Sequence, residues 1–463
     1  MKKTIVTLAI GCMSSLVWAN PQLTALTDEQ LSLVDGAALL NMVYTAPDQT
    51  NAAMRAENIG FYKLAMNADM EINVNIAKLQ LGCGGDNGPG CDIDIDHLSL
   101  SGLSDTSDGR ASSSALINNP FIEFAIKNPN AAATREVVGF RLSAEKVQGL
   151  LTTGIQNSNV PNGINTLSGY MKVQSDSSGM IKGLATTAAT RDNLYGANAV
   201  RGRLQALNLG GLAEVDFETT AGGFNIPEIR DNPFTTPAIV VNGKRLSYVN
   251  LTSRVNVPDI NLGEGAAYPV NGNVNYNANG NPTGVNTQGG LVTATVRDCN
   301  LLACLLAPVG SKFERVYMNG TITGIKADLN LKQSLGLIHS LPLNSAMSLS
   351  LQTQPIHWLG ANDDDIAQHG WWRSAKDPVN IGDVIPQNAI VIDQLFPQIS
   401  EKVSAYLQAN PVQTTDLGGL LKIGELSTNI GTINLSNSPL KLHVENLSLR
   451  GQDFAPNCFG AAP

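Results

Sequence analysis

The chain contains few charged residues, few aromatic residues and no long apolar segment beyond residue 19. Charged residues account for 15% and aromatic residues for 5% of the 463 positions. A membrane-spanning helix needs about 20 consecutive apolar residues, and no later segment reaches that length, which excludes an integral helical membrane protein. Basic runs are also absent and the formal net charge is -9, so nucleic acid is a poor partner.

Signatures of the common enzyme classes are missing as well. The sequence has no Gly-x-Ser-x-Gly elbow, no His-Glu-x-x-His segment and no phosphate-binding P-loop. Carboxylates are present, but their spacing in sequence cannot place two of them across a scissile bond. We therefore predict no catalytic residues and no cofactor, and we expect that the protein is not an enzyme.

The first 19 residues have the three parts of a secretory signal peptide. Lys2 and Lys3 form the charged start, residues 4–18 are mostly apolar, and Ala19 ends a small-residue cleavage site. We expect cleavage after Ala19 and an exported mature chain, in the periplasm, on the outer membrane surface or outside the cell. A lipoprotein leader that ends at Cys12 is the alternative.

The composition after the leader indicates β structure. Gly occurs 44 times, and Asn, Ser and Thr are abundant, as in proteins with many turns and small polar strand residues. We predict a mainly β fold of extended or sandwich-like sheets with bent strands and two or three minor helices. Four segments alternate apolar and polar residues with the period of a strand that has one buried face: 71–76, 92–96, 325–331 and 440–445.

One ten-residue pattern occurs twice, in residues 93–102 and 442–451. Both copies read apolar-polar-apolar-acid-polar-Leu-Ser-Leu-polar-Gly, and residues 74–82 and 204–210 are looser copies. The apolar phase slips by one residue midway, which would turn later side chains to the other face of a straight strand. We predict a bulge or corner that keeps both apolar sets on one core. Chance similarity between β-rich segments is the alternative.

Three segments have helical patterns. Thr27 and Gln30 form a capping box for a short helix that stops at Gly36. Ser143 can cap a second helix, which would carry Val147, Leu150 and Leu151. Residues 393–409 have apolar side chains at helical spacing.

We divide the mature chain into a β-rich region 20–230 and a β-rich region 231–463 that holds the 393–409 helix. Gly, Asn and Pro become frequent between residues 222 and 245, where we place the boundary. Residues 269–290 are rich in Asn and Gly and predict hairpin turns or a loop.

Five cysteines follow the leader. Cys83 and Cys91 enclose a Gly-rich turn, and only four residues separate Cys299 from Cys304. An exported chain favours two local disulfides, Cys83–Cys91 and Cys299–Cys304. Zinc binding is the alternative for the second pair, although no nearby His completes a zinc signature. Cys458 is left to be free, to pair with another chain or to replace one of these partners.

Asp92, Asp94 and Asp96 are weak calcium candidates. They would lie on one side of a strand, and calcium binds clustered oxygen ligands. Successive residues on one side of a strand are about 6–7 Å apart, however, which is wide for sharing one ion. The alternative is a solvated strand face.

The tryptophans of the mature chain fall in residues 354–377. Trp358, Trp371 and Trp372, with Arg373, are candidates for a binding surface, because Trp beside polar groups stacks on sugars or anchors protein partners. The alternative is a loop that folds onto its own aromatic residues.

Two pieces of the chain carry a resemblance to a known family. The first is Leu26-Thr27-Asp28-Glu29-Gln30-Leu31-Ser32-Leu33-Val34-Asp35-Gly36. The second combines Leu349-Ser350-Leu351-Gln352-Thr353-Gln354 with His357-Trp358 and Gly370-Trp371-Trp372. Together they resemble the Fil-type (FilA-like) proteins, which are assigned to a pilus system of Gram-negative bacteria. The resemblance implies an exported surface protein of a fimbria-like system, with no catalytic residues and with other envelope or pilus-system proteins as partners.

We therefore expect a structural or adhesive role at the cell envelope, with pairing of open strand edges as the means of assembly. The alternative is an envelope binding module. It would bind a glycan through the tryptophans or a lipid along a concave apolar sheet.

Overall fold

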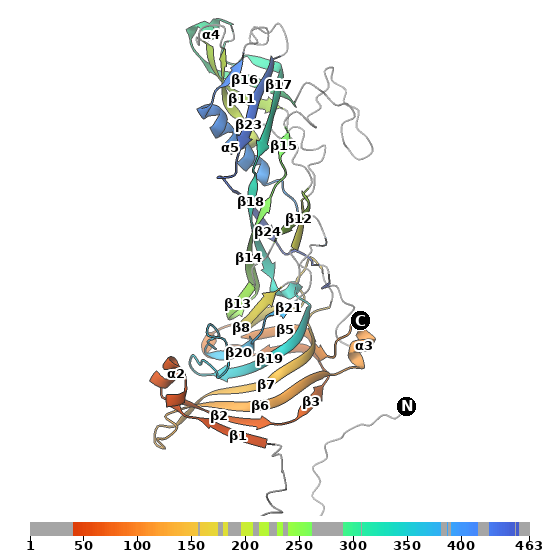
Figure 1. The fold of residues 1–463 in the computed structure, drawn as a ribbon, viewed down its shortest axis with the longest axis vertical. Helices are drawn as coiled ribbons and strands as arrows, with labels where there is room; N and C mark the ends of the chain where they lie inside the picture. Colours follow the sequence, from red (N-terminus) through yellow and green to blue (C-terminus); the bar gives the residue numbers. More distant parts are fainter. Residues whose placement is uncertain are drawn as a thin grey trace, which may run out of the picture. The chain divides into compact units, whose positions relative to one another are not determined.

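The computed structural model describes residues 40–155, 158–174, 179–183, 196–206, 213–221, 229–234, 239–261, 290–306, 308–380, 387, 390–414, 426–449 and 451–452. These residues belong to one compact unit, Leu40–Pro463. The fold is mainly β, as predicted (Figure 1). The predicted leader, the 27–36 helix, most of the 269–290 segment and Cys458 lie outside the described residues.

The largest described sheet, which we call the first sheet, has twelve strands. Its main path is β1 (Leu40–Thr45), β2 (Ile59–Met66), β6 (Ala115–Lys127), β7 (Glu136–Thr152), β19 (Ser340–Gln352), β20 (Gly370–Ala375), β8 (Ile164–Gln174), β5 (Ile93–Ser101) and β4 (Val74–Leu81). Three further strands pair with members of this path: β3 (Asp69–Ile72), β13 (Ile239–Leu246) and β21 (Val379–Asn380). Figure 1 shows β2, β6, β7 and β19 following one another across the sheet.

The middle of the first sheet closes on itself. Strand β5 pairs with β4 along one edge, and along its other edge it pairs first with β8, from Ile93 to Ile95, and then with the end of β7, where Ser99 lies opposite Thr152. The pairings of β7 with β19, β19 with β20, β20 with β8, β8 with β5 and β5 with β7 therefore form a closed ring of paired strands. The outer path from β6 to β1 extends from this ring as an open curved sheet.

A second sheet of seven strands lies in other parts of the chain. Its strands are β10 (Arg201–Ala206), β11 (Ala213–Ala221), β15 (Ile260–Asn261), β16 (Gly290–Cys299), β17 (Lys312–Thr323), β22 (Val412–Thr414) and β23 (Leu426–Asn434). Two smaller sheets contain β14 (Tyr248–Asn256), β18 (Lys326–Ser334) and β24 (Leu440–Glu445), and β9 (Gly179–Gly183) with β12 (Ile229–Phe234). The short helices are α2 (Ala52–Ala56), α3 (Ser107–Ala111) and α4 (Leu301–Leu306).

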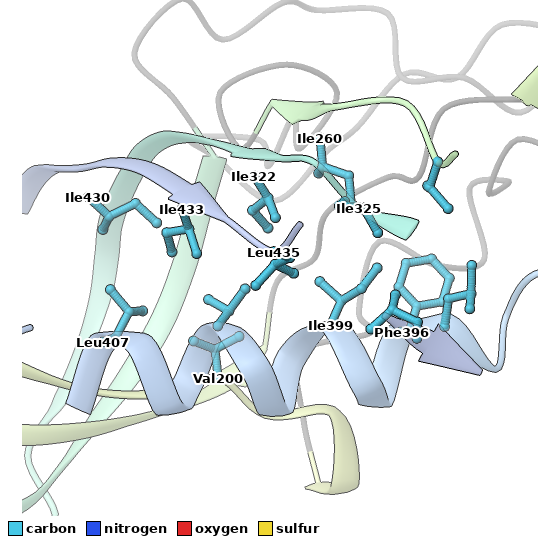
Figure 2. Packing of buried hydrophobic residues seen from close by; sticks show 14 of the residues in the cluster. Val200, Ile260, Ile322, Ile325, Phe396, Ile399, Leu407, Ile430, Ile433 and Leu435 are labelled. Atoms are coloured by element: carbon cyan, nitrogen blue, oxygen red, sulfur yellow. The ribbon is translucent and has the colours of Figure 1, made fainter. Parts of the chain in front are cut away.

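The predicted 393–409 helix is confirmed as α5 (Leu395–Ala409). Leu395, Ile399, Val403 and Leu407 are spaced by four residues and are all buried. Figure 2 shows Ile399 and Leu407 of this helix directed toward the apolar side chains of strands that carry Ile322, Ile430 and Ile433. The helix therefore covers the apolar core of the second sheet.

The prediction of a helix after Ser143 is wrong, because Ser143, Val147, Leu150 and Leu151 belong to strand β7. Strand β6 pairs along one side of β7 and β19 along the other. The Ser143 hydroxyl, predicted as a helix cap, instead donates to the carbonyl of Met347 at 2.9 Å. Pairing on both sides supplies the backbone hydrogen bonds that a helix would have made internally, and tertiary context decides between the two.

The predicted phase correction is confirmed in both copies of the ten-residue pattern. His97 and Asn446, at the fifth position of each copy, have left-handed φ angles of 51° and 53°. Residues on both sides of each point face the same apolar core: Ile95 and Leu98 in one copy, Val444 and Leu447 in the other. The shared backbone conformation at the shared position favours a recurring bent strand over chance similarity.

The predicted division at residue 230 does not coincide with the division into sheets. Strands β13, β19, β20 and β21 come from the region after residue 230 and pair within the first sheet. Strand β19 alone pairs with β7 over twelve residue positions. The chain therefore forms β10 and β11 of the second sheet before it returns to complete the first sheet with β13, β19, β20 and β21.

Candidate functional site: an apolar cavity with an unpaired arginine

One face of the first sheet borders a cavity of about 600 Å³ that is open to solvent. We call the face that lines this cavity the inner face. Its lining is almost entirely apolar and comes from β1 to β7, β19 and β20: Leu40, Leu64, Met66, Met70, Ile72, Leu79, Ile93, Ile95, Leu98, Leu100, Ile117, Pro120, Phe121, Ile122, Leu142, Ser143, Ala144, Val147, Leu151, Leu343, Met347, Ser348 and Leu349, with Arg373 as its charged member. Both the volume and the composition are typical of a pocket for a small apolar ligand.

Two left-handed residues keep the lining continuous where strand alternation alone would break it. His97 lies in the middle of β5, and Asn119, with φ of 46°, lies in the middle of β6. Ile95 and Leu98 flank the first point, and Ile117 and Pro120 flank the second; all four line the cavity. A straight strand would have turned one member of each pair outward, so the bends enlarge the apolar surface of the inner face.

A single row of inner-face residues crosses five paired strands. Strand register aligns Leu64 with Ile122, Ile122 with Leu142, Leu142 with Leu349, and Leu349 with Arg373. Leu64 and Leu142 remain 41% and 43% exposed. The row therefore presents accessible aliphatic carbon over most of its length and ends at a guanidinium.

Arg373 faces inward because of strand alternation in β20. Its neighbours at two residues, Trp371 and Ala375, both pack into the apolar cluster of the inner face, whereas Trp372 packs on the opposite side. Nη1 of Arg373 lies 3.6 Å from Sδ of Met171. Nη2 is buried and has no hydrogen-bond partner among the described residues. Burial lowers the pKa of Arg373 to about 10, which still leaves the side chain charged at neutral pH.

The opposite face of the sheet, the outer face, contains an arginine in a different environment. Arg141 forms an ion pair with Glu123, and Nη2 donates to the carbonyl of Leu359 at 3.0 Å. Its guanidinium also lies 5.1 Å from the centre of the Trp358 ring. Burial lowers the pKa of Arg141 and raises that of Glu123, while each charge favours ionisation of the other.

The predicted tryptophan surface is divided between the two faces. Trp358 and Trp372 are 3% and 1% exposed and belong to the apolar cluster of the outer face. The indole Nε1 of Trp372 donates to Asp365 at 3.0 Å. Trp371 is partly buried against the inner-face cluster. Neither buried indole presents a stacking surface, so the loop lies folded over its own aromatic residues, and Arg373 faces away from Trp372.

The three candidate calcium ligands are bound by side chains of the protein. Asp92 is buried and pairs with Nε of Arg245 at 3.0 Å. Asp94 and Asp96 share Lys78, whose Nζ lies 2.6 and 2.8 Å from them. Among the residues that the structure describes, no group of three or more His, Cys, Asp or Glu side chains is arranged to hold a metal.

Asp92 also positions the start of β20. Its carboxylate accepts the backbone N–H of Trp371 at 3.0 Å. Gly370 has a φ of 100°, and a Cβ at this position would collide with the same carboxylate, so only glycine suits this contact. Asp92 thereby fixes the strand on which Arg373 lies.

Both predicted disulfides, Cys83–Cys91 and Cys299–Cys304, are present. The first closes the turn before Asp92. Nη1 of Arg245 donates to the carbonyl of Gly88 in this turn at 3.1 Å, so the disulfide and the Arg245–Asp92 pair hold the same corner of the first sheet.

None of the described helices is both long and apolar enough to cross a membrane. Comparison with known proteins adds no relative. No family model matches the chain, and no curated protein or solved structure matches it.

Proposed function

We propose that this chain is an exported envelope protein that binds an apolar chain, such as an acyl chain, in the cavity of the first sheet. The continuous aliphatic lining of a cavity of about 600 Å³ carries the proposal. Each methylene group that moves from water into such a site contributes about 0.8 kcal/mol. The leader-like first 19 residues and the two disulfides support export.

Lipid extraction and ligand displacement test this proposal. We expect organic extraction of the purified protein, followed by mass spectrometry, to recover an acyl-chain compound. A fluorescent fatty acid should bind the protein and be displaced by unlabelled hexadecanoate. Absence of both signals would refute the proposal.

A matched pair of variants locates the binding. Leu100 lines the cavity, whereas Leu103, three residues beyond it, is 70% exposed and does not line it. Leu100→Trp should fill part of the cavity and weaken binding at least about tenfold, because it removes more than about 1.4 kcal/mol of apolar contact. Leu103→Trp should bind as the wild type does. If the purified protein contains no lipid but forms a dimer, and Leu100→Trp abolishes that dimer, then a second copy of the chain occupies the cavity instead.

The structural role expected from the sequence has separate support in β1. Among the described strands, β1 pairs only with β2 and so has an open edge. Leu40, Met42, Val43 and Tyr44 of this strand are all exposed. An open edge with apolar side chains invites a strand from a partner, so we propose β1 as the surface for assembly with another envelope or pilus-system protein.

Charges on this edge test the second proposal. Met42→Lys combined with Val43→Lys should prevent strand addition and remove the protein from sheared surface fibres. Leu351→Lys, at an exposed site on β19, is the control and should leave the fibre fraction unchanged. Equal recovery of both variants in that fraction would refute assembly through β1.

A further inference from the structure

Arg373 is the exception among the buried and half-buried arginines of the first sheet that the structure describes. Arg141 is paired with Glu123, and Arg245 is paired with Asp92. Among the residues that the structure describes, Arg373 has only the sulfur of Met171 within hydrogen-bonding distance, and its Nη2 atom is buried without a partner. An uncompensated buried charge is strongly unfavourable, and buried polar groups in folded proteins almost always have partners.

The position of Arg373 indicates where a partner would come from. The side chain lines the cavity and ends the row that begins at Leu64. The nearest residue across the β19–β20 pair is Leu349, and no carboxylate among the described residues pairs with the guanidinium. A counter-ion for Arg373 therefore has to enter through the cavity, alongside aliphatic side chains.

We propose that the ligand is a fatty acid or a similar amphiphile whose carboxylate binds Arg373 while its chain lies along the aliphatic row. This inference rests on the proposed binding of an apolar chain and names its head group. The planar guanidinium donates two parallel hydrogen bonds to a carboxylate. The described lining contains no second cation, so the site matches one anionic group on one apolar chain.

The test compares three ligands with the same chain on the full-length protein isolated from cells and freed of co-purified lipid on a hydrophobic resin. Hexadecanoate, methyl hexadecanoate and hexadecyl phosphate are titrated by displacement of a neutral fluorescent alkyl probe. Hexadecanoate should bind about ten- to a hundredfold more tightly than the methyl ester, because a hydrogen bond to a charged group contributes about 1.5–3 kcal/mol. This comparison requires no variant and so cannot fail through misfolding.

Variants then assign the preference to Arg373. Arg373→Met should remove the preference for the acid and leave the affinity for the methyl ester unchanged. Arg373→Lys should retain part of the preference, because it keeps the charge but loses the planar fork. Arg254→Met changes an arginine whose side chain is 60% exposed and should behave as the wild type.

The outcomes separate this inference from the proposed function. Equal affinity of wild-type protein for the acid and the ester would overturn the role of Arg373 while leaving the apolar site intact. If hexadecyl phosphate binds more tightly than hexadecanoate and this difference depends on Arg373, the head group is a phosphate and the proposed carboxylate is wrong. Failure of all three ligands and of the neutral probe would overturn the proposed function itself.

Discussion

Two neighbouring rows of side chains cross the first sheet, one on each face, and each contains an arginine. On the outer face, strand register aligns Lys63, Glu123 and Arg141, and the row continues to Trp372. On the inner face, the adjacent row is aliphatic until it reaches Arg373. One row neutralises its cation within the protein, whereas the other does not, although both belong to the same strands.

The difference separates a structural arginine from one available to a ligand. Arg141 has a carboxylate, a carbonyl and an aromatic ring as neighbours, so its charge is compensated and its Nη2 holds the loop over the outer face, although its Nε is also buried without a hydrogen-bond partner among the described residues. Arg373 has a cavity beside it. A buried polar group without a partner calls for an explanation, such as a ligand or ion that completes its hydrogen bonds.

The largest expected effect on stability comes from removing the arginine of the outer-face row. Arg141→Met leaves Glu123 buried with only the charge of Lys63 to favour its ionised form, and removing one partner of a buried ion pair costs about 3–5 kcal/mol. We expect the free energy of unfolding, measured by urea denaturation, to fall by that amount. Arg254→Met, at an exposed ion pair with Asp328, should cost about 1 kcal/mol or less. A loss of similar size in both variants would show that Arg141 is no more important than a surface arginine.

The second prediction concerns the inner row with its ligand. A ligand at a hundred times its dissociation constant stabilises the folded protein by about 2.7 kcal/mol. Hexadecanoate at that concentration should therefore stabilise the wild type by this amount in the same urea experiment. At the same ligand concentration Arg373→Met should gain much less. Equal stabilisation of the two proteins would place the carboxylate elsewhere.

In the ligand-free protein, replacing Arg373 should not lower the free energy of unfolding, whereas replacing Arg141 should lower it. Arg373→Met removes a charge that has no counter-ion and replaces it with an apolar side chain of similar length. We expect the free energy of unfolding of the ligand-free protein to stay constant or to rise by about 1 kcal/mol. A loss comparable with that of Arg141→Met would mean that Arg373 has a structural partner, and the contrast between the two faces would disappear.

Several local elements of this fold were predictable from the sequence. Alternation identified β5, β18 and β24, and helical spacing identified α5, because each pattern depends on the residues of one segment. The phase slip after Asp96 predicted the bend that the left-handed His97 provides. The spacing of Ser143, Val147 and Leu150 suits a helix as well as a bulged strand, and only the pairing of β7 with β6 and β19 decides between them.

The site itself depends on information that no single segment contains. Alternation in β20 separates Arg373 from Trp372, but the sequence does not indicate which of the two sides is the inner face. That side is set by the pairing of β19 with β7, which joins residues about 200 positions apart. The tryptophans drew attention to the correct segment, yet the residue of interest was their charged neighbour.

The smallest expected effect is a pH dependence on the outer face. Burial raises the pKa of Asp365 more than the hydrogen bonds from Ser374 and Trp372 and the charges of His357 and Arg141 lower it. A carboxyl whose pKa is higher in the folded state contributes stability below its unfolded pKa of about 4, and this contribution is lost as the pH rises through the folded value.

Between pH 4 and neutral pH, the wild type should therefore lose slightly more stability than Asp365→Asn, which keeps an oxygen acceptor for the indole of Trp372. Urea denaturation at a series of pH values measures this difference. Asp363→Asn, at an exposed neighbouring position, should follow the wild-type curve. If Asp365→Asn also follows that curve, Asp365 is fully solvated in the folded state, and the outer face is less tightly closed by its loop than the burial of Trp358 and Trp372 indicates.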